Sequence, residues 1–371
     1  MHVGSIRLSQ FRNYGSLEVP FHPRLNLILG MNAQGKTSLL EALYCLSAAR
    51  SFRAGGDDEM IQFGRESAAV EGLLQKEKGQ DRVFLEFRKH KGKTLTLNGK
   101  KQKKLSALLG QMPAVVFSPD DLFLVKGGPA LRRKYLDLTI LQLDGGFLPH
   151  YQQYERALKQ RNALLRQRPA DLDPQLRLWD EPLAEHGAAI LARRLKAARE
   201  LSRWAAQALA DLTGGQEKFE LRYESALAPG GEGAGKDDIR KAFAKARREE
   251  MARGITVVGP HRDDIGLYVN GELLRKFGSQ GQQRTAALAL KLAQLSLLAE
   301  GCHTEPLVLF DDVMSELDEK RQAFFLERLQ RGGQAFLTGT AARDFAAAAR
   351  SARIFTVEGG RVGLTQEGPA A

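Results

Sequence analysis

Eight residues near the start of the chain, Gly30 to Thr37 (GMNAQGKT), follow the spacing GxxxxGK[ST] and stand between two apolar segments. The preceding run LNLILG is typical of a buried strand, and the following SLLEALYCL has the apolar spacing of a helix that starts at Thr37. A strand, a glycine loop and a helix in this order direct backbone N–H groups and a helix N-terminus at phosphates. The segment therefore predicts a nucleotide-binding loop in an α/β fold.

The residues of this loop have separate predicted roles. Gly30 and Gly35 allow the loop to curl, and Lys36 would hold the β and γ phosphates. The hydroxyl of Thr37 would complete the shell of a magnesium ion. The predicted ATP site consists of Gly30, Met31, Asn32, Ala33, Gln34, Gly35, Lys36, Thr37 and Ser38.

A second segment, Leu307 to Asp312 (LVLFDD), is an apolar strand that ends in two carboxylates. In an ATPase this arrangement places Asp311 against the magnesium ion and Asp312 near the attacking water. By itself the pattern is weak, because apolar strands that end in acids often only mark an exposed loop. Together with the glycine loop it predicts Thr37 and Asp311 as metal ligands and Asp312 as a catalytic residue.

A third segment, Phe277 to Arg284 (FGSQGQQR), precedes a long amphipathic helix and resembles the LSGGQ signature of ABC ATPases. Ser279, Gly281 and Gln282 match the signature, and Gln280 replaces its first glycine. The resemblance implies that one subunit brings these three residues to the ATP of another, with Ser279 and Lys36 joining Asp312 in catalysis. The alternative is an ordinary helix start with Ser279 as N-cap.

Ser315 to Asp318 (SELD) looks like the D-loop of the same superfamily. The resemblance places Asp318, with Ser279 and Gly281, at a dimer interface. A helix-start capping pattern explains the same residues, and both interpretations can hold.

Composition limits the class of protein. The chain has 371 residues, of which 43% are hydrophobic, and this is more than a single hydrophobic core usually accommodates. Two domains are therefore expected. The formal net charge of +11 attracts polyanions, either nucleic acid or an acidic membrane face. The two cysteines, Cys45 and Cys302, lie far apart without metal-ligand spacing, and neither a leader peptide nor a membrane-spanning run is evident. We expect a soluble, cytoplasmic protein.

The pattern of elements changes twice along the chain. Strand-like segments dominate up to about Gly110 and include an Asn98-Gly99 hairpin signal, whereas helical spacing dominates from Asp121. Alternating strands and helices return after Ile255. We therefore predict a mixed α/β head assembled from residues 1–118 and 256–371, with a mostly helical domain inserted at residues 119–255.

Longer segments carry a more specific resemblance. Pro119 to Asp137, Val258 to Asp264 (VGPHRDD) and Leu309 to Leu326 look like signature segments of the RecF family of DNA repair proteins, an ABC/SMC-type ATPase family. FRNY near the start and ARSFR after the first helix fit the same family. The resemblance spans essentially the whole chain.

That resemblance implies an SMC-like head and a function in DNA replication, DNA damage repair, homologous recombination and the SOS response. It implies binding of ATP and Mg²⁺, ATP-dependent homodimerisation, binding of gapped duplex or single-stranded DNA, and slow DNA-stimulated hydrolysis. The implied partners are RecR and RecO, which assist the loading of RecA at single-strand gaps.

Several positions depart from the broader ABC pattern. Asp312 stands where transporters carry glutamate, Thr338 or Thr340 stands where their switch histidine falls, and Ser118 replaces the usual Q-loop glutamine. Gln62 is a weaker Q-loop candidate. For His261 and Arg262, a nucleotide-sensing or interface role and a buried structural role remain equally open.

The candidates for DNA contact are basic runs at Arg88 to Lys93, Lys100 to Lys104, Leu191 to Arg199 and Lys245 to Arg248. Such runs suit a sequence-tolerant binder with strong salt dependence, although any single run is more often a solvated face. Two other classes compete with a repair ATPase: the nucleotide-binding subunit of a membrane transporter and a non-hydrolysing scaffold gated by nucleotide. Slow hydrolysis would distinguish the repair ATPase from both.

Overall fold

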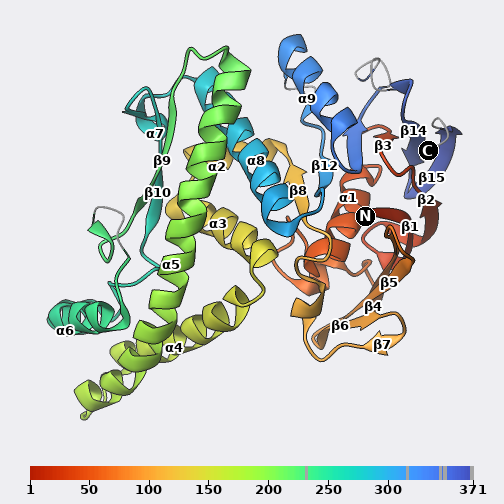
Figure 1. Ribbon diagram of the computed structural model, residues 1–371. Helices are drawn as coiled ribbons and strands as arrows, with labels where there is room; N and C mark the ends of the chain where they lie inside the picture. Colours follow the sequence, from red (N-terminus) through yellow and green to blue (C-terminus); the bar gives the residue numbers. More distant parts are fainter. Residues whose placement is uncertain (230–232, 315–316, 342–344, 346–348, 368–371) are drawn as a thin grey trace. The chain divides into compact units, whose positions relative to one another are not determined.

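The computed structural model describes residues 1–229, 233–314, 317–341, 345 and 349–367 (Figure 1). The chain divides into two compact units, one formed by Met1–Asp121 with Leu298–Ala371 and the other by Leu122–Leu297. We call them the head unit and the central unit. An α/β head built from both ends of the chain with a mostly helical insertion is confirmed as the fold class.

The second boundary differs from the one that the sequence predicted. Residues 256–297 group with the central unit and not with the head. The reason is their packing, because strand β10 pairs with a strand of the insertion and the Tyr135 hydroxyl donates a 2.6 Å hydrogen bond to the carbonyl of Leu290.

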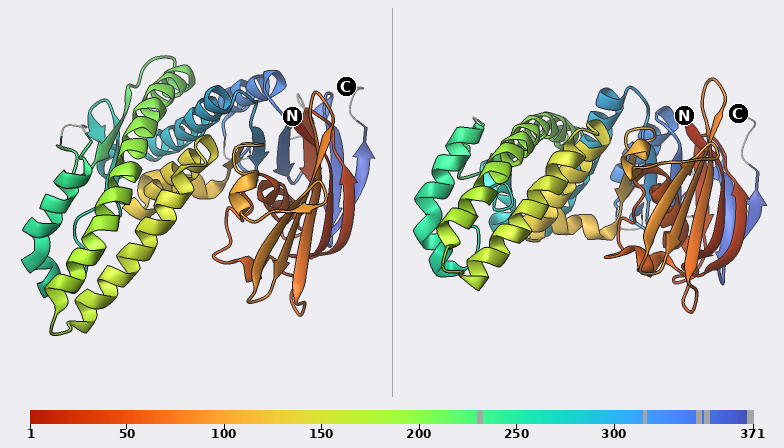
Figure 2. Two further views of the ribbon diagram at one scale, coloured as in Figure 1. Left: turned by 60° about the horizontal axis from the view of Figure 1, so that its bottom comes forward. Right: turned by 90° about the horizontal axis from the view of Figure 1, so that it is seen from below.

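Sheet A of the head unit is antiparallel, with strands in the order β2-β1-β4-β5-β6-β7 (Figure 2). Buried and exposed side chains alternate along β4 and β5, which fits a sheet with one covered face. The predicted Asn98-Gly99 turn joins β6 to β7, with φ values of 49° and 78°. The strands are β1 His2–Phe11, β2 Tyr14–Pro20, β4 Ser67–Gln75, β5 Gln80–Arg88, β6 Gly92–Leu97 and β7 Lys100–Lys101.

Sheet B of the head unit has the order β15-β14-β3-β13-β12-β8. All of these strands except β15 are parallel, and β3, β8, β12 and β13 are buried throughout, as expected when both faces are covered. The strands are β3 Leu25–Leu29, β8 Ala114–Phe117, β12 Leu307–Phe310, β13 Ala335–Gly339, β14 Arg353–Glu358 and β15 Arg361–Gln366.

Helix α1 (Lys36–Ala48) packs against strands of both sheets, including β4 of sheet A and β8 of sheet B. Its apolar side chains and those of both sheets form one core cluster. The loop before α1 is therefore held at the carboxyl edge of sheet B, where ligands of parallel α/β folds bind. The other head helices are the 3₁₀ turns η1 Asp57–Met60, η2 Leu105–Leu108 and η3 Pro119–Asp121, and α9 Glu319–Arg331.

The central unit is dominated by the pair α4 (Phe147–Gln167) and α5 (Leu172–Thr213), which lie side by side in Figures 1 and 2. At 42 residues, α5 is about 63 Å long. Buried ion pairs fix it to its neighbours, including Arg194 with Asp137 at 2.7 Å and Asp180 with Arg161 at 2.9 Å. The remaining helices are α2 Leu122–Lys126, α3 Pro129–Leu143, α6 Lys236–Arg253, α7 Leu274–Phe277 and α8 Gln280–Cys302.

Sheet C of the central unit has the order β11-β10-β9 and was only half predicted from the sequence. Strands β10 (Asp264–Val269) and β11 (Glu272–Leu273) lie in the region after Ile255 where alternating strands and helices were expected, but that region was predicted to belong to the head. Its neighbour β9 (Phe219–Glu224) was missed, although FELRYE alternates apolar and polar residues. None of the described helices is both long and apolar enough to cross a membrane.

Candidate nucleotide-binding site

The loop between β3 and α1 has the tight geometry that its two predicted glycines suggested. A Cβ atom at Gly30 would collide with the carbonyl oxygen of Val357, and one at Gly35 would lie 2.9 Å from the hydroxyl of Tyr14. Gly35 also has φ = 120°, which side chains rarely adopt. A larger residue at either position would displace the loop.

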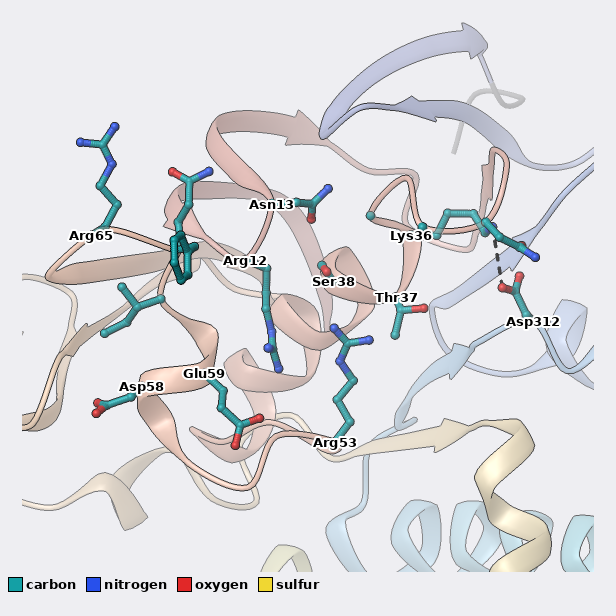
Figure 3. A pocket seen from close by; sticks show the side chains of 16 residues that line it. Arg12, Asn13, Lys36, Thr37, Ser38, Arg53, Asp58, Glu59, Arg65 and Asp312 are labelled. Atoms are coloured by element: carbon teal, nitrogen blue, oxygen red, sulfur yellow. Dashed lines mark ion pairs between the residues drawn. The ribbon is translucent and has the colours of Figure 1, made fainter.

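Lys36 is buried, with 3% of its side chain exposed, and its ammonium lies over the loop. Nζ donates hydrogen bonds of 2.8 Å to the carbonyl of Gly30 and 3.2 Å to that of Met31. It also lies 3.7 Å from a carboxylate oxygen of Asp312, which Figure 3 marks with a dashed line. The positive charge is thus fixed between the glycine loop and the end of β12.

Thr37 and the two carboxylates meet at the edge of sheet B. The Thr37 hydroxyl donates a 2.7 Å hydrogen bond to Asp311, although 274 positions separate the two residues. Burial raises the pKa of Asp311 above its ordinary value, the charge of Asp312 raises it further, and the bond from Thr37 acts in the opposite direction. Because burial disfavours the charged form of this carboxylate, a cation beside Asp311 would stabilise it.

Asp312 follows directly and has a left-handed backbone, with φ = 54°. Thr338 of β13 fixes it, because the Thr338 hydroxyl accepts the Asp312 N–H at 2.9 Å and lies 3.1 Å from the Asp312 carboxylate. The same hydroxyl lies 3.4 Å from the Asp311 carboxylate. Thr340, the other candidate for the switch position, is exposed.

The tip of the β1–β2 hairpin supports the glycine loop, a function that the sequence did not reveal. Asn13 donates to the carbonyl of Gln34 at 3.0 Å, and the Tyr14 hydroxyl donates to that of Gly35 at 3.0 Å. The β14–β15 turn holds the other side, since the Gly359 N–H donates to the Gln34 side chain at 2.7 Å. These contacts give a structural role to Asn13 and Tyr14 of the FRNY segment, which the sequence had indicated only as part of the resemblance to the RecF family.

A second unpredicted group surrounds Glu41 of α1, whose side chain is fully buried. Arg12 donates two hydrogen bonds of 2.7 Å to it, Ser51 donates another, and Arg53 forms an ion pair at 3.4 Å. A buried carboxylate needs such partners. Glu41 therefore orients two arginines from two different segments.

Those arginines line a cavity of about 1170 Å³ beside the loop (Figure 3). In Figure 3 the guanidinium of Arg53 points toward Thr37. Gln62 also lines this cavity, whereas Ser118 binds the Asp121 side chain through its N–H. The lining residues are Arg12, Asn13, Asn32, Ala33, Gly35, Lys36, Thr37, Ser38, Arg53, Asp58, Glu59, Ile61, Gln62, Phe63, Arg65 and Asp312.

In the central unit, the signature-like segment forms the start of α8. Ser279 and Gly281 are exposed, and the Ser279 hydroxyl accepts the Gln282 N–H at 3.2 Å. The Gln282 side chain accepts the Ser279 N–H at 2.9 Å in return. This reciprocal pair is a capping box, so the helix-start interpretation holds for these residues. Their role at a partner's ATP remains a prediction.

The D-loop prediction falls partly on Ser315 and Glu316, which lie outside the described residues. Asp318 is the N-cap of α9, and its carboxylate accepts the Arg321 N–H at 2.9 Å. The capping interpretation is confirmed for Asp318, and the interface role stays a prediction.

His261 and Arg262 make bonds within the central unit. Burial is the main reason that the pKa of His261 falls to about 4. Its Nε2 lies 3.1 Å from the Thr256 carbonyl and its Nδ1 lies 2.6 Å from the Tyr154 hydroxyl, so a neutral ring donates to the former and accepts from the latter. Arg262 is exposed and donates to the same Thr256 carbonyl at 2.7 Å. These contacts favour the structural role, most clearly for His261.

The basic runs differ in how far their charges are committed to other residues. Arg194 is buried against Asp137, and Arg247 is paired with Asp180 and Asp173. Lys93 is held by Asp57 at 2.8 Å. In the run from Lys100 to Lys104, by contrast, all four lysines are exposed, and the first two form the edge strand β7 of sheet A.

Comparison with known proteins identifies the family to which this chain belongs. The model of the RecF/RecN/SMC N terminal domain matches residues 2–362. The DNA replication and repair protein RecF of Symbiobacterium thermophilum is 40% identical, over 99% of this chain and 100% of that protein. The chain belongs to the RecF family. RecF of Bacillus subtilis is 39% identical over 92% of this chain and 93% of that protein.

Solved structures agree with membership of the RecF family. Two structures of the recombination mediator protein RecF in the RecFOR pathway, one with ATPrS and one with ATP, give TM-scores of 0.91 and 0.90 at 34% and 33% identity. Each covers 98% of both chains. The Smc head domain of Pyrococcus furiosus, at 15% identity, has a TM-score of 0.56 over 99% of this chain and 96% of that one, which confirms the SMC-like fold.

Proposed function

We propose that this chain is an ATP-dependent, DNA-binding recombination mediator that acts in single-strand gap repair. The observation that carries the proposal is the meeting of Lys36 and Thr37 with Asp311 and Asp312 at one edge of sheet B. RecF relatives about one-third identical were solved with ATP and ATPrS, which supports ATP as the nucleotide. The predicted loop from Gly30 to Ser38 would bind its phosphates.

A magnesium ion fits the residues at this edge. The Thr37 hydroxyl and the Asp311 carboxylate are hard oxygen donors, and Mg²⁺ is usually held by one or two carboxylates together with substrate phosphates. The raised pKa of Asp311 indicates a carboxylate that gains from a neighbouring cation. Bound there, the ion would neutralise charge on the phosphate oxygens.

Asp312 is proposed to orient and deprotonate the attacking water. The left-handed backbone and the bond from its N–H to Thr338 fix its position beside Lys36. Its side chain is one methylene shorter than the glutamate of transporters, which is consistent with slow turnover. Thr338, which contacts both carboxylates, would keep them apart from each other in a defined geometry.

The active form is proposed to be an ATP-dependent homodimer. The loop from Gly30 to Ser38 and the segment with Ser279, Gly281 and Gln282 would come from different subunits, with Asp318 at the interface. A monomer would then bind ATP without completing the site. DNA would stimulate the slow hydrolysis that resets the dimer.

DNA is proposed to contact the exposed lysines from Lys100 to Lys104, because their charges are the most accessible of the four basic runs. Phosphate contacts of this kind give sequence-tolerant binding that weakens steeply with salt. The RecFOR pathway of the relatives suggests RecR and RecO as partners, with RecA loaded as the outcome.

Light scattering with Mg²⁺ and ATP tests the proposal. The wild type should dimerise, Lys36→Met should bind ATP roughly 100-fold more weakly and should not dimerise at ATP concentrations that saturate the wild type, and Asp312→Asn should dimerise but hydrolyse ATP roughly 100-fold more slowly. Repeating the measurement with gapped duplex DNA at two salt concentrations should show retention of the dimer that weakens with salt. ATP binding by the wild type without any dimer would contradict the composite site.

A further inference from the structure

The side chain of Gln282 is bonded at both ends. Its Oε1 accepts the N–H of Ser279 at 2.9 Å, and its Nε2 donates to Oε1 of Glu217 at 2.9 Å. Glu217 lies 65 positions earlier, just before β9, and nothing in the sequence pattern marks it. The tail of the signature-like segment is therefore tied to a distant carboxylate.

This pair of bonds explains why a glutamine stands at position 282. A capping box accepts glutamate or glutamine equally well, because either supplies an oxygen to the N–H of the N-cap residue. Only the carboxamide can accept from Ser279 and donate to Glu217 at the same time. A glutamate would bring two carboxylates together at this point.

The surroundings hold both partners in place. The backbone next to Glu217 is fixed to the β10–β11 turn, since Lys218 and Asn270 exchange two hydrogen bonds of 2.9 Å. On the other side, Gln283 donates to the carbonyl of Leu274 at 3.0 Å, and the N–H of Gly278 donates to the same carbonyl at 3.0 Å. The two segments that Glu217 and Gln282 join are thus each anchored independently.

The bonds also determine which donors of the segment point outward. The Ser279 hydroxyl accepts from Gln282, so its own hydrogen remains for an outside acceptor. The first N–H groups of a helix, here those of Gln280 and Gly281, have no partner within the helix. A rotation of the Gln282 side chain would release the Ser279 N–H and change this arrangement.

We propose that Glu217 is a positioning residue, which acts through Gln282 to hold Ser279 and the start of α8 in the geometry that receives the γ-phosphate of a partner's ATP. The inference rests on the proposed function, because it assumes that the signature-like segment meets ATP across a dimer. It predicts an effect on dimerisation and none on ATP binding by the monomer.

The test compares three full-length variants with the wild type. Glu217→Ala removes the acceptor, Glu217→Gln removes the charge but keeps an oxygen for Gln282, and Glu220→Ala removes a nearby exposed carboxylate that pairs with Arg222 on the surface. Three quantities are measured: ATP affinity at low protein concentration, the ATP-dependent dimer dissociation constant, and hydrogen exchange of the peptide that contains Ser279.

Glu217→Ala should weaken the dimer by about 3- to 10-fold, the range for one lost hydrogen bond, and leave ATP affinity unchanged. Exchange at Ser279 should be about 5-fold faster. Glu217→Gln should stay within about twofold of the wild type in the dimer and exchange measurements, and Glu220→Ala should match the wild type.

Equal dimerisation by the wild type and Glu217→Ala would overturn the inference. So would a loss in Glu217→Gln as large as that in Glu217→Ala, since charge rather than the bond would then matter. If the wild type itself does not dimerise with ATP, the proposed function fails. The exchange of the Ser279 amide without nucleotide still decides whether Glu217 positions the segment.

Discussion

The glycine loop and the signature-like segment are both helix starts, yet they are stabilised in different ways. The glycine loop is held by residues from distant parts of the chain, and its Thr37 and Lys36 face the buried carboxylate of Asp311 and the half-buried one of Asp312, respectively. The signature-like segment is largely exposed and is held by its own capping box and by the bond from Gln282 to Glu217. The difference suggests that the first can bind a nucleotide alone, while the second can only add donors to a nucleotide that is already bound.

The largest expected effect is that of Lys36→Met. Methionine keeps the apolar stem but removes the charge that we propose holds two phosphates, so ATP affinity should fall by roughly 100-fold. Isothermal titration of the monomer measures it, with Lys91→Met as the control at an exposed lysine. Unchanged affinity would remove the distinction between the two segments, since the glycine loop would then not be the binding half.

Ser279→Arg addresses the other segment. A bulky side chain at this exposed helix start should weaken the ATP-dependent dimer by about 30-fold through steric conflict. ATP affinity of the monomer should remain that of the wild type. If ATP affinity of the Ser279→Arg monomer falls instead, the signature-like segment also contributes to ATP binding by the monomer. The division of roles between the two segments would then be wrong.

The third prediction concerns the pH dependence of the stability of the central unit, to which His261 belongs. Its pKa is about 4 in the folded protein and about 6.5 when unfolded, so the unfolded state binds more protons between these values. Stability of the central unit should therefore fall as pH is lowered from 6.5 toward 4, by about 2 kcal/mol at pH 5 from this residue. Thermal unfolding of the wild type and His261→Gln at pH 5 and 7.5 measures it, with His303→Gln as the control. An identical pH slope in wild type and His261→Gln would contradict the assignment.

The smallest effect is expected at the edge of sheet B. Thr338→Val keeps the shape of the side chain but leaves the Asp312 N–H without its acceptor, which should cost about 1–2 kcal/mol of unfolding free energy. Thr340→Val, at an exposed position, should cost almost nothing. Urea unfolding compares the two, and equal values would mean that Thr338 does not fix Asp312.

The sequence predicted the elements that are determined by residues close together in the chain. The glycine loop, the Asn98-Gly99 turn and the strand before Asp311 all depend on a few neighbouring residues, and the structure contains each of them. The head fold followed from their order along the chain.

Most contacts between distant residues were not predicted, and the meeting of Thr37 with Asp311 is an exception because each of the two residues belongs to a recognisable motif. Glu41 has the same appearance as any helical glutamate, and its bonds to Arg12 and Ser51 exist only after the segments pack. The same holds for Glu217 and for the pairing of β9 with β10, which moved the domain boundary. The spacing of residues along the chain does not indicate which of these distant residues will be in contact.

The separation of contacts along the chain also bears on synthesis at the ribosome. The central unit is one continuous segment, so all of it can leave the ribosome and fold while β12, β13 and β14 have not yet been made. Sheet B needs those strands, and the glycine loop is held by Gly359, 325 positions after Gln34. The nascent chain can therefore complete its central unit before it makes the strands that complete sheet B and the Gly359 that supports the glycine loop.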